Sequence, residues 1–431
     1  MAGLWKSHRT VLRKLVNVFP SFPVEGLGSP AVLHRCRFCA VRKCEEKTTD
    51  NQVVLGIETS CDDTGAAVVS SDGQVLGQAL ATQQDLHLRH GGIIPTLARQ
   101  LHEDNIQQVV DTALAEARIS PQDLTAVAAT VKPGMALPLS VGVQYGKALA
   151  LAHNKPFIPV HHMEAHALTA RMLYKIDFPF LVLLVSGGHC LVVLARALHQ
   201  WSIIGSTLDD APGEALDKGA RRLKLRNLPE CASMSGGRAV EHLARSGDPL
   251  AFTFPSPLLQ HADCSFSFAG LKQCLFKIAE NLEGEHGVVG GQVVPQVNDV
   301  CASFQHAITG HLLRRTHKAM VYVSARHLLP PHAQTLVVSG GVACNQYIRG
   351  ALQRLCDTAG YQLIVPPPHL CTDNGIMIAW NGMERWLAQK GVLYNREEIE
   401  AVRFEPRAPM GEDLSEDVRT LRIKAPKAIK F

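Results

Sequence analysis

Two histidines spaced for metal binding are the first chemically informative feature of this sequence. His162 and His166 are four positions apart and begin an apolar helical stretch, so both imidazoles would share one helix face and could bind one ion. About one such pair is expected by chance among 20 histidines, so the spacing alone is weak evidence. We expect a third ligand from the irregular segment 366–375, where Asp373 precedes a predicted helix. The alternative for Thr372 or Asp373 is a helix N-cap.

A zinc-peptidase interpretation of this stretch fails on the position of its glutamate. Zinc peptidases place the glutamate next to the first histidine, in the pattern H-E-x-x-H. Here Glu164 comes two residues after His162, roughly 200° around a helix. Its carboxylate would face away from the ion, so it could not act as the general base.

Two glycine-rich turns after apolar runs indicate a nucleotide site. The sequence Val-Ser-Gly-Gly occurs at residues 185–188 and again at 338–341. Glycine lets backbone N–H groups approach a phosphate closely. A single Gly-Gly after a strand is more often only a tight turn. Two of the same form favour a nucleotide.

The elements that carry these turns are repeated along the chain. The first half has predicted strands at residues 53–57, 66–69, 75 onward and 126–129, and an amphipathic helix at 94–117. The second half has predicted strands at residues 180–185, 191–194, 203–204 and 336–339, and a helix from about Asn345. Each half starts with strand, polar turn and strand, which predicts a duplicated α/β fold with two lobes and a cleft between them. We assign residues 51–160 to the first lobe, 161–388 to the second, and 389–431 to a C-terminal segment that packs back on the first lobe.

The N-terminus has the composition of a mitochondrial presequence. Residues 1–44 contain eight Lys or Arg and one acidic residue, whereas the other 387 residues carry a net charge near −3. Apolar side chains at Leu12, Leu15, Val16 and Phe19 give this basic stretch an amphipathic helical pattern. We therefore predict a presequence and linker over residues 1–50 and a mitochondrial location; the alternative is a disordered basic tail.

Membrane spans and disulfides are not expected. The longest apolar runs are well short of the ~18 residues that a membrane span needs. The twelve cysteines are scattered, which is typical of reduced thiols. Cys36 and Cys39 form a C-x-x-C followed by Cys44, but a zinc knuckle would need a second ligand pair nearby.

Several motifs together resemble one family. They are Gly56-Ile57-Glu58-Thr59-Ser60-Cys61-Asp62-Asp63-Thr64, His161-His162-Met163-Glu164-Ala165-His166, Leu184-Val185-Ser186-Gly187-Gly188-His189 and Cys371-Thr372-Asp373-Asn374-Gly375, with two further segments at residues 209–218 and 263–272. In this order they resemble the TsaD family of tRNA N6-adenosine threonylcarbamoyltransferases over about residues 53–388. With the basic leader, the chain is most similar to the mitochondrial branch. Thr96 after Pro95 and the Lys132-Pro133-Gly134 loop depart from the family pattern.

The resemblance implies a fold and a set of site residues. The fold would be the duplicated actin/Hsp70/sugar-kinase architecture with a nucleotide and metal cleft. One divalent cation, which the ligand types leave open as zinc, iron or manganese, would be held by His162, His166 and Asp373. The residues that would hold the adenylate are Leu184, Val185, Ser186, Gly187, Gly188, Asp217, Gly237, Glu241, Cys344, Asn345 and Thr372. Asp62 or Asp63 could orient or deprotonate the acceptor amine; the alternative is that both only form a turn.

The reaction implied is transfer of a threonylcarbamoyl group from threonylcarbamoyl-adenylate, made by a separate synthase, to the N6 amine of the adenosine 3′ of the anticodon, releasing AMP. The partners would be mitochondrial tRNAs, and the enzyme a monomer or homodimer. Alternatives on the same fold are an ATP-driven kinase or chaperone module and a non-catalytic tRNA-binding scaffold. For tRNA phosphates we expect the basic cluster 218–226, with Arg314, Arg315 and Lys318 as a second candidate.

Overall fold

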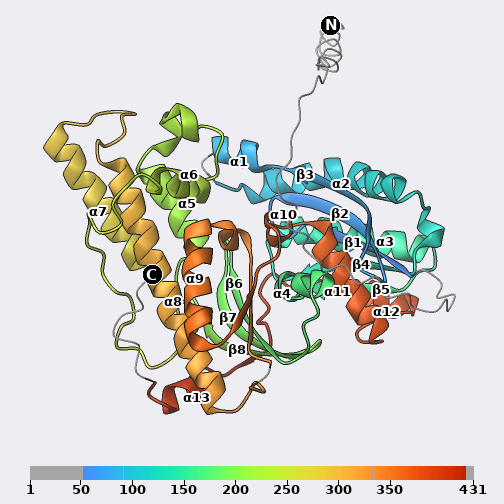
Figure 1. Cartoon of the computed structure of the whole chain (residues 1–431). Helices are drawn as coiled ribbons and strands as arrows, with labels where there is room; N and C mark the ends of the chain where they lie inside the picture. The colour runs from blue at the N-terminus through green and yellow to red at the C-terminus, as the bar shows by residue number, and fades with distance from the viewer. Residues whose placement is uncertain (1–51, 91, 332, 424–431) are drawn as a thin grey trace, which may run out of the picture. The chain divides into compact units, whose positions relative to one another are not determined.

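A computed structural model describes residues 52–90, 92–331 and 333–423 of the chain. Residues 49–431 belong to one compact unit built on two β-sheets (Figure 1). The predicted presequence and linker, with Cys36, Cys39 and Cys44, lie outside the described residues.

The first sheet is an antiparallel meander extended by two parallel strands. Its strands are β1 (Val53–Glu58), β2 (Asp63–Ser70), β3 (Val75–Thr82), β4 (Ala126–Lys132) and β5 (Phe157–His161), in the order β3-β2-β1-β4-β5. The β2–β3 turn closes where the Gly73 N–H donates to the Ser70 carbonyl, and Gly73 has a φ of 82°, which favours glycine. β4 runs parallel to β1, and β5 runs parallel to β4.

The second sheet repeats this topology. Its strands are β6 (Phe180–Val185), β7 (Cys190–Ala197), β8 (Gln200–Ser206), β9 (Thr335–Ser339), β10 (Gln362–Ile364) and β11 (Glu412–Asp413). β6, β7 and β8 form an antiparallel meander, and β9 and β10 follow in parallel on the other side of β6. The order β8-β7-β6-β9-β10 thus matches that of the first sheet, and only β11 is added. The predicted duplicated α/β fold is confirmed.

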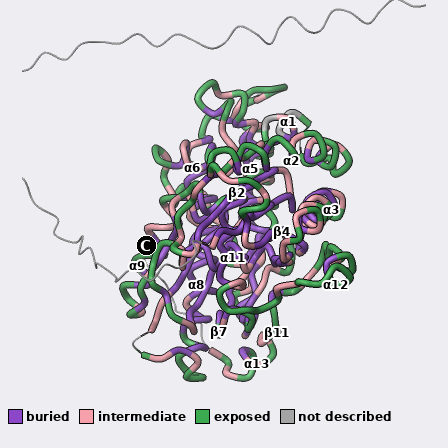
Figure 2. The backbone as a smooth tube through the Cα atoms, turned by 90° about the vertical axis from the view of Figure 1, so that its right-hand side faces the viewer, coloured by how far each residue is buried: buried purple, intermediate pink, exposed green. Residues whose placement is uncertain are grey.

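Helices cover both sheets in layers. On one face of the first sheet lie α2 (Pro95–Ala117) and α3 (Ala136–Ala152), and on the other lies α11 (Gly375–Leu387), packed against α4 (His162–Leu173). The second sheet packs one face on α5 (Pro212–Arg222), α6 (Gly236–Ala244), α7 (Ala269–His286), α8 (Val297–Ala325) and α9 (Gln346–Ala359). Its other face shares one apolar core with α4, α11 and the first sheet. Much of the buried chain in Figure 2 lies in the strands, α8 and α11.

Residues 375–423 make contacts that can be compared with the proposed lobe boundaries. α11 lies within the predicted second lobe but packs mainly on β1 and β2, which favours placing it with the first sheet. Further along, Leu393 pairs with Phe157 of β5, and α12 (Arg396–Ala401) contacts α3. The chain then returns to the second sheet, where β11 pairs with β8 and α13 (Ser415–Thr420) follows. The C-terminal segment therefore contacts both sheets.

The described residues contain neither a membrane-spanning helix nor a disulfide. No helix among them is long and apolar enough to cross a membrane. All nine cysteines in the described ranges are free, as expected for reduced thiols.

Candidate functional site

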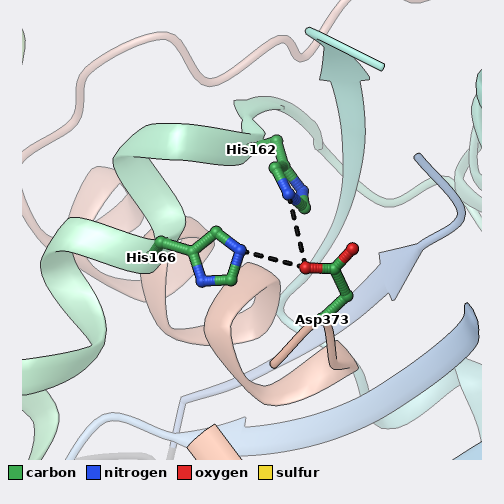
Figure 3. A group of neighbouring side chains, drawn as sticks. All are labelled: His162, His166 and Asp373. Atoms are coloured by element: carbon green, nitrogen blue, oxygen red, sulfur yellow. Dashed lines mark hydrogen bonds and ion pairs between the residues drawn. The ribbon is translucent and has the colours of Figure 1, made fainter. Parts of the chain in front are cut away.

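The two spaced histidines lie on the first two turns of α4. β5 runs directly into this helix, so His162 is its first residue and His166 follows one turn later. Both side chains are buried, and their rings lie perpendicular with centroids 4.7 Å apart. Figure 3 shows both imidazoles turned toward Asp373. The helical spacing predicted from sequence therefore does bring the two rings together.

Asp373 reaches the histidines from the segment between α10 (Pro368–Cys371) and α11. Its Oδ1 atom lies 3.0 Å from His166 Nε2 and 3.5 Å from His162 Nε2. The N-cap of α11 is Asn374, whose Oδ1 accepts from the Met377 N–H at 2.9 Å. Neither Thr372 nor Asp373 is therefore needed as the cap, and the carboxylate of Asp373 is free to face the histidines.

Glu58, at the end of β1, is a site residue to which the sequence reasoning gave no role. It is fully buried, and its Oε2 lies 3.0 Å from His162 Nδ1 and accepts from Thr130 Oγ1 at 2.7 Å. Ser60 Oγ lies 3.1 Å from the same His162 nitrogen. Glu58 thus fixes the ring so that Nε2 faces Asp373, the arrangement by which carboxylates orient metal-binding histidines. The sequence signal for a role of Glu58 is its position: it is an ionisable residue at the end of an otherwise apolar strand.

Burial and nearby charges shift the pKa values of the residues around His162. Burial lowers the pKa of His162, but the carboxylates of Glu58 and Asp373 outweigh it and raise that pKa to about 9. Burial likewise raises the pKa of Asp373, while His162 and His166 shift it downward overall. Burial and the two histidines lower the pKa of His189 to about 4, so this half-buried ring beside the cluster is neutral at pH 7.

A divalent cation fits these residues. The ligand atoms of His162, His166 and Asp373 all lie within 4.8 Å of one another, and two of the three residues are buried. Glu58 adds a second carboxylate, which is fully buried, so the group carries negative charge that a cation would offset. Two imidazoles and one carboxylate suit zinc, iron or manganese.

The acidic turn, residues 58–64, joins β1 to β2 and includes both predicted catalytic aspartates. The Asp62 carbonyl accepts from the Gln83 N–H at 3.1 Å. Asp63 has a buried Oδ1 with no hydrogen-bond partner. Burial, with Asp62 and Asp373 nearby, raises the pKa of Asp63 to about 7 despite a hydrogen bond with Thr82. Asp63 is thus within electrostatic reach of the metal-ligand candidates and poised to exchange a proton near neutral pH.

The glycine turn, residues 186–189, follows β6, whose last residues Leu184 and Val185 are buried. It is closed by the Ser186 N–H donating to the His189 carbonyl at 2.9 Å and the His189 N–H donating to Ser186 Oγ at 3.1 Å. Gly187 and Gly188 are exposed, and a Cβ on either would meet nothing within 4 Å. Their backbone is therefore open to a ligand.

The second Val-Ser-Gly-Gly segment plays a packing role as well. Gly340 has a φ of 99°, and a Cβ there would lie 2.4 Å from the Val185 carbonyl oxygen. Only glycine allows the turn after β9 to pass so close to the end of β6. The two similar turns therefore lie side by side.

The other proposed adenylate residues form two contacting groups. Asp217 of α5 accepts from the Gly237 N–H at 3.0 Å, and burial raises the pKa of Asp217. Glu241 of α6 accepts from the Gln346 N–H at 2.8 Å, directly after Asn345. The Asn345 side chain caps α9 by accepting from Ile348 and donates to Gln305 Oε1 at 2.8 Å.

A cavity lies beside Glu241, Gln305 and Gln346. Its volume is ≈ 410 Å³. The residues that line it include Glu241, Arg245, Pro249, Gln305, Gln346 and Tyr347.

Cys344 and Thr372 lie at either side of α10. Cys344 Sγ donates to the Pro368 carbonyl at 3.7 Å, so the short helical turn before α9 contacts the segment that leads to Asp373. Thr372 is exposed, and its carbonyl accepts from Asn374 Nδ2 at 2.7 Å.

The basic residues proposed to contact tRNA are mostly engaged within the protein. Lys218 pairs with Glu214 at 2.6 Å, while Arg222 and Lys224 both pair with Glu283. These ion pairs neutralise much of the 218–226 cluster. Arg221 and Arg226 are exposed at the surface.

The second basic candidate is wrong for two of its three residues. Arg315 and Lys318 are buried in α8. There they donate to backbone carbonyls of the 258–263 loop, with Arg315 Nη1 3.0 Å from the Asp263 carbonyl and Lys318 Nζ 2.7 Å from that of His261. The helical spacing of these cations could not show whether they face solvent or donate to a loop inside the protein.

The fold and site define an α/β protein of the duplicated actin/Hsp70/sugar-kinase class, with a His-His-Asp group beside glycine-rich turns. Residues 74–380 match the family model of TsaD, tRNA N6-adenosine threonylcarbamoyltransferase. The chain therefore belongs to this family.

Two mitochondrial relatives of about 50% identity support the same assignment. The chain is 52% identical over 380 residues to the mitochondrial tRNA N6-adenosine threonylcarbamoyltransferase of Danio rerio, covering 88% of this chain and 93% of that one. It is 50% identical over 377 residues to the mitochondrial enzyme of Homo sapiens, covering 88% and 90%. Among solved structures, component A of the Acidaminococcus fermentans (R)-2-hydroxyglutaryl-CoA dehydratase is 13% identical with a TM-score of 0.42, over 78% of this chain and 98% of that one. The predicted mitochondrial location is confirmed by the mitochondrial relatives.

Proposed function

We propose that this protein transfers the threonylcarbamoyl group of threonylcarbamoyl-adenylate to the N6 amine of the adenosine 3′ of the anticodon in mitochondrial tRNAs. The observation that carries the proposal is the His162–His166–Asp373 group beside the acidic turn and the glycine turn, in a member of the TsaD family. N6 attacks the carbamoyl carbon, the bond from that carbon to the phosphate oxygen breaks, and AMP leaves. N6 loses one proton in the process.

One divalent cation is held by His162, His166 and Asp373 in this proposal. When bound, it supplies Lewis-acid stabilisation of carbonyl or phosphate oxygens. The chain's own contribution is orientation. Glu58 and Ser60 hold the Nδ1 side of the His162 ring and thereby leave Nε2 facing Asp373, where it could bind the cation.

The adenylate is proposed to bind from the glycine turn to the cavity beside α6. The open backbone of Gly187 and Gly188, after Leu184, Val185 and Ser186, suits the phosphate and carbamoyl oxygens. Asp217, with Gly237, and Glu241 offer carboxylates for ribose hydroxyls. The ≈ 410 Å³ cavity is large enough for a purine ring. Asn345, Cys344 and Thr372 are the remaining residues proposed to contact the adenylate, and Thr372 directly precedes Asp373.

Asp63 is the better of the two aspartates for accepting the N6 proton. Its pKa of about 7 lets it hold or release a proton at physiological pH, and its buried Oδ1 has no competing partner. A neutral adenine amine is a weak nucleophile, so positioning carries much of the rate enhancement. Asp62 is proposed to support the turn through its carbonyl contact with Gln83.

The test is reconstitution with a defined product. Purified protein is incubated with a divalent metal, tRNA, threonine, bicarbonate, ATP and the separate synthase, and the tRNA is digested and analysed by mass spectrometry for threonylcarbamoyladenosine. We expect the modified nucleoside and an equal amount of AMP from the transfer step. ATP hydrolysis without modified nucleoside would favour a kinase or chaperone module. Binding of tRNA that needs neither metal nor adenylate, with no product, would favour a scaffold.

A further inference from the structure

His102 is a buried histidine that contacts both sides of the two aspartates in the acidic turn. It lies on α2, and its side chain is fully buried. Its Nε2 is 3.1 Å from the Cys61 carbonyl oxygen, and its Nδ1 is 2.7 Å from Thr64 Oγ1. One imidazole therefore bridges the residue before Asp62 and the residue after Asp63.

The two bonds define the state of this ring. A carbonyl oxygen can only accept, so Nε2 must donate to Cys61. In a neutral imidazole Nδ1 then accepts, and the Thr64 hydroxyl donates to it. Burial lowers the pKa of His102, which keeps the ring neutral and compatible with both bonds.

Packing alone does not require a histidine here. α2 already buries Ile106, Val109, Val110 and Ala113 against the first sheet. A buried polar ring lowers stability unless its hydrogen bonds are made, and an apolar residue would fill the space without that requirement. Both bonds of His102 are directed at the acidic turn.

The acidic turn also lies near the His162–His166–Asp373 group. A Cβ on Gly65, the next residue of β2, would lie 2.8 Å from the Gly375 nitrogen, so the start of β2 presses against the start of α11. Asp373 lies two residues before Gly375. The distance from Asp63 to the metal ligands therefore depends on how the acidic turn is held.

We infer that His102 is a positioning residue: its bonds to the Cys61 carbonyl and the Thr64 hydroxyl hold Asp63 in place for the proton transfer. This inference rests on the role given to Asp63 in the proposed function. His102 itself does not contact the reacting atoms. It acts through the turn, so its effect exists only while Asp63 is present.

A double-mutant cycle in the full-length protein tests this role. His102→Leu should lower kcat about tenfold or more, with KM for the adenylate unchanged within about twofold, because only the acidic turn is displaced. In an Asp63→Asn background the same change should lower kcat less than about twofold. His102→Gln, which keeps an N–H donor and an acceptor, should recover part of kcat.

Thr64→Val and Thr125→Val form a matched control pair. Each replaces a threonine whose hydroxyl makes a hydrogen bond in the first sheet, but Thr125 Oγ1 accepts from the Val53 N–H at the opposite end of β1. Both should lower Tm, and only Thr64→Val should lower kcat. A normal kcat in folded His102→Leu, or an equal loss in the Asp63→Asn background, would overturn the inference. A fully active Asp63→Asn protein, or a wild type without transfer, would instead contradict the proposed function.

Discussion

The acidic turn and the glycine turn occupy equivalent places in the two sheets but are built in opposite ways. Each follows the first strand of its meander, β1 or β6, and leads into the antiparallel second strand. The acidic turn is held by buried side chains: Glu58 bonds to Thr130 and His162, and His102 bonds to Thr64. The glycine turn is closed on itself through Ser186 and has no side chain at its two central positions.

This difference shows how one duplicated topology can provide two kinds of chemistry. Side chains fixed by buried bonds place a carboxylate with a raised pKa near the His162–His166–Asp373 group. A turn with two bare glycines leaves its backbone open, and we propose that this backbone holds an anionic part of the adenylate. A substitution in the acidic turn or its contacts should therefore change kcat, whereas one in the glycine turn should change KM.

The largest effect is expected at the His162–His166–Asp373 group near the acidic turn. His162→Ala and Asp373→Ala should each reduce transfer by more than about 100-fold, since even residues that only support a metal ligand cost 10- to 100-fold. Metal content by elemental analysis and nucleoside analysis would be measured together. His199 is an exposed histidine in the turn between β7 and β8, so His199→Ala is the control and should retain both. Near-normal transfer by a metal-free His162→Ala protein would refute the assignment.

Asp63→Asn should produce the next largest effect, a fall in kcat of about 100-fold or more, typical for loss of a general base. With a pKa of about 7, wild-type kcat should rise with pH through neutrality and then level off, and the variant should lack this rise.

Stability gives a second measurement of the same residue. The folded pKa lies above the ordinary value of 3.8, so the folded state binds the Asp63 proton more tightly. Between pH 3.8 and 7 the contribution of Asp63 to the stability of the wild type therefore falls as pH rises. Asp63→Asn should remove this loss and raise Tm most above pH 7. Equal Tm differences at pH 4 and pH 8 would contradict the raised pKa.

Sequence patterns predict the parts of this comparison that depend on local spacing. The repeated strands, the helix at 94–117 and the two glycine turns follow from periodicity and glycine placement, and the structure confirms them. Glu58 and His102 could not be assigned, because their partners are 104 and 38 residues away and no local pattern joins them. Arg315 and Lys318 failed for the related reason that spacing gives a helix face but not what covers it.

Gly187→Val tests the other side of the comparison. Open space surrounds the position of the new Cβ, so the free energy of unfolding should change by no more than about 0.5 kcal/mol. A side chain there would block the backbone that we propose holds the adenylate, and KM for the adenylate should rise about tenfold, equal to about 1.4 kcal/mol. Gly340→Ala is the contrasting variant: a φ of 99° and a Cβ 2.4 Å from the Val185 carbonyl should impair folding instead. An unchanged KM in Gly187→Val would place the phosphate elsewhere.

The smallest effect is expected at the proposed tRNA surface beyond Asp217, where Lys218, Arg222 and Lys224 form ion pairs within the protein. Arg221 and Arg226 are exposed, so changing both to Glu should weaken tRNA binding and reduce the slope of log affinity against log salt by about one unit per lost phosphate contact. Arg222→Glu should behave differently: Arg222 pairs with Glu283 at 2.7 Å, so its replacement should lower Tm and leave the salt slope nearly unchanged. Arg196→Glu, an exposed site on β7, controls for net charge. Affinity for tRNA would be measured from 50 to about 300 mM salt, with adenylate binding measured in parallel and expected to stay constant. Superimposable salt plots for the wild type and the Arg221/Arg226 variant would place the RNA surface on another part of the molecule, without affecting the assignments of the two turns.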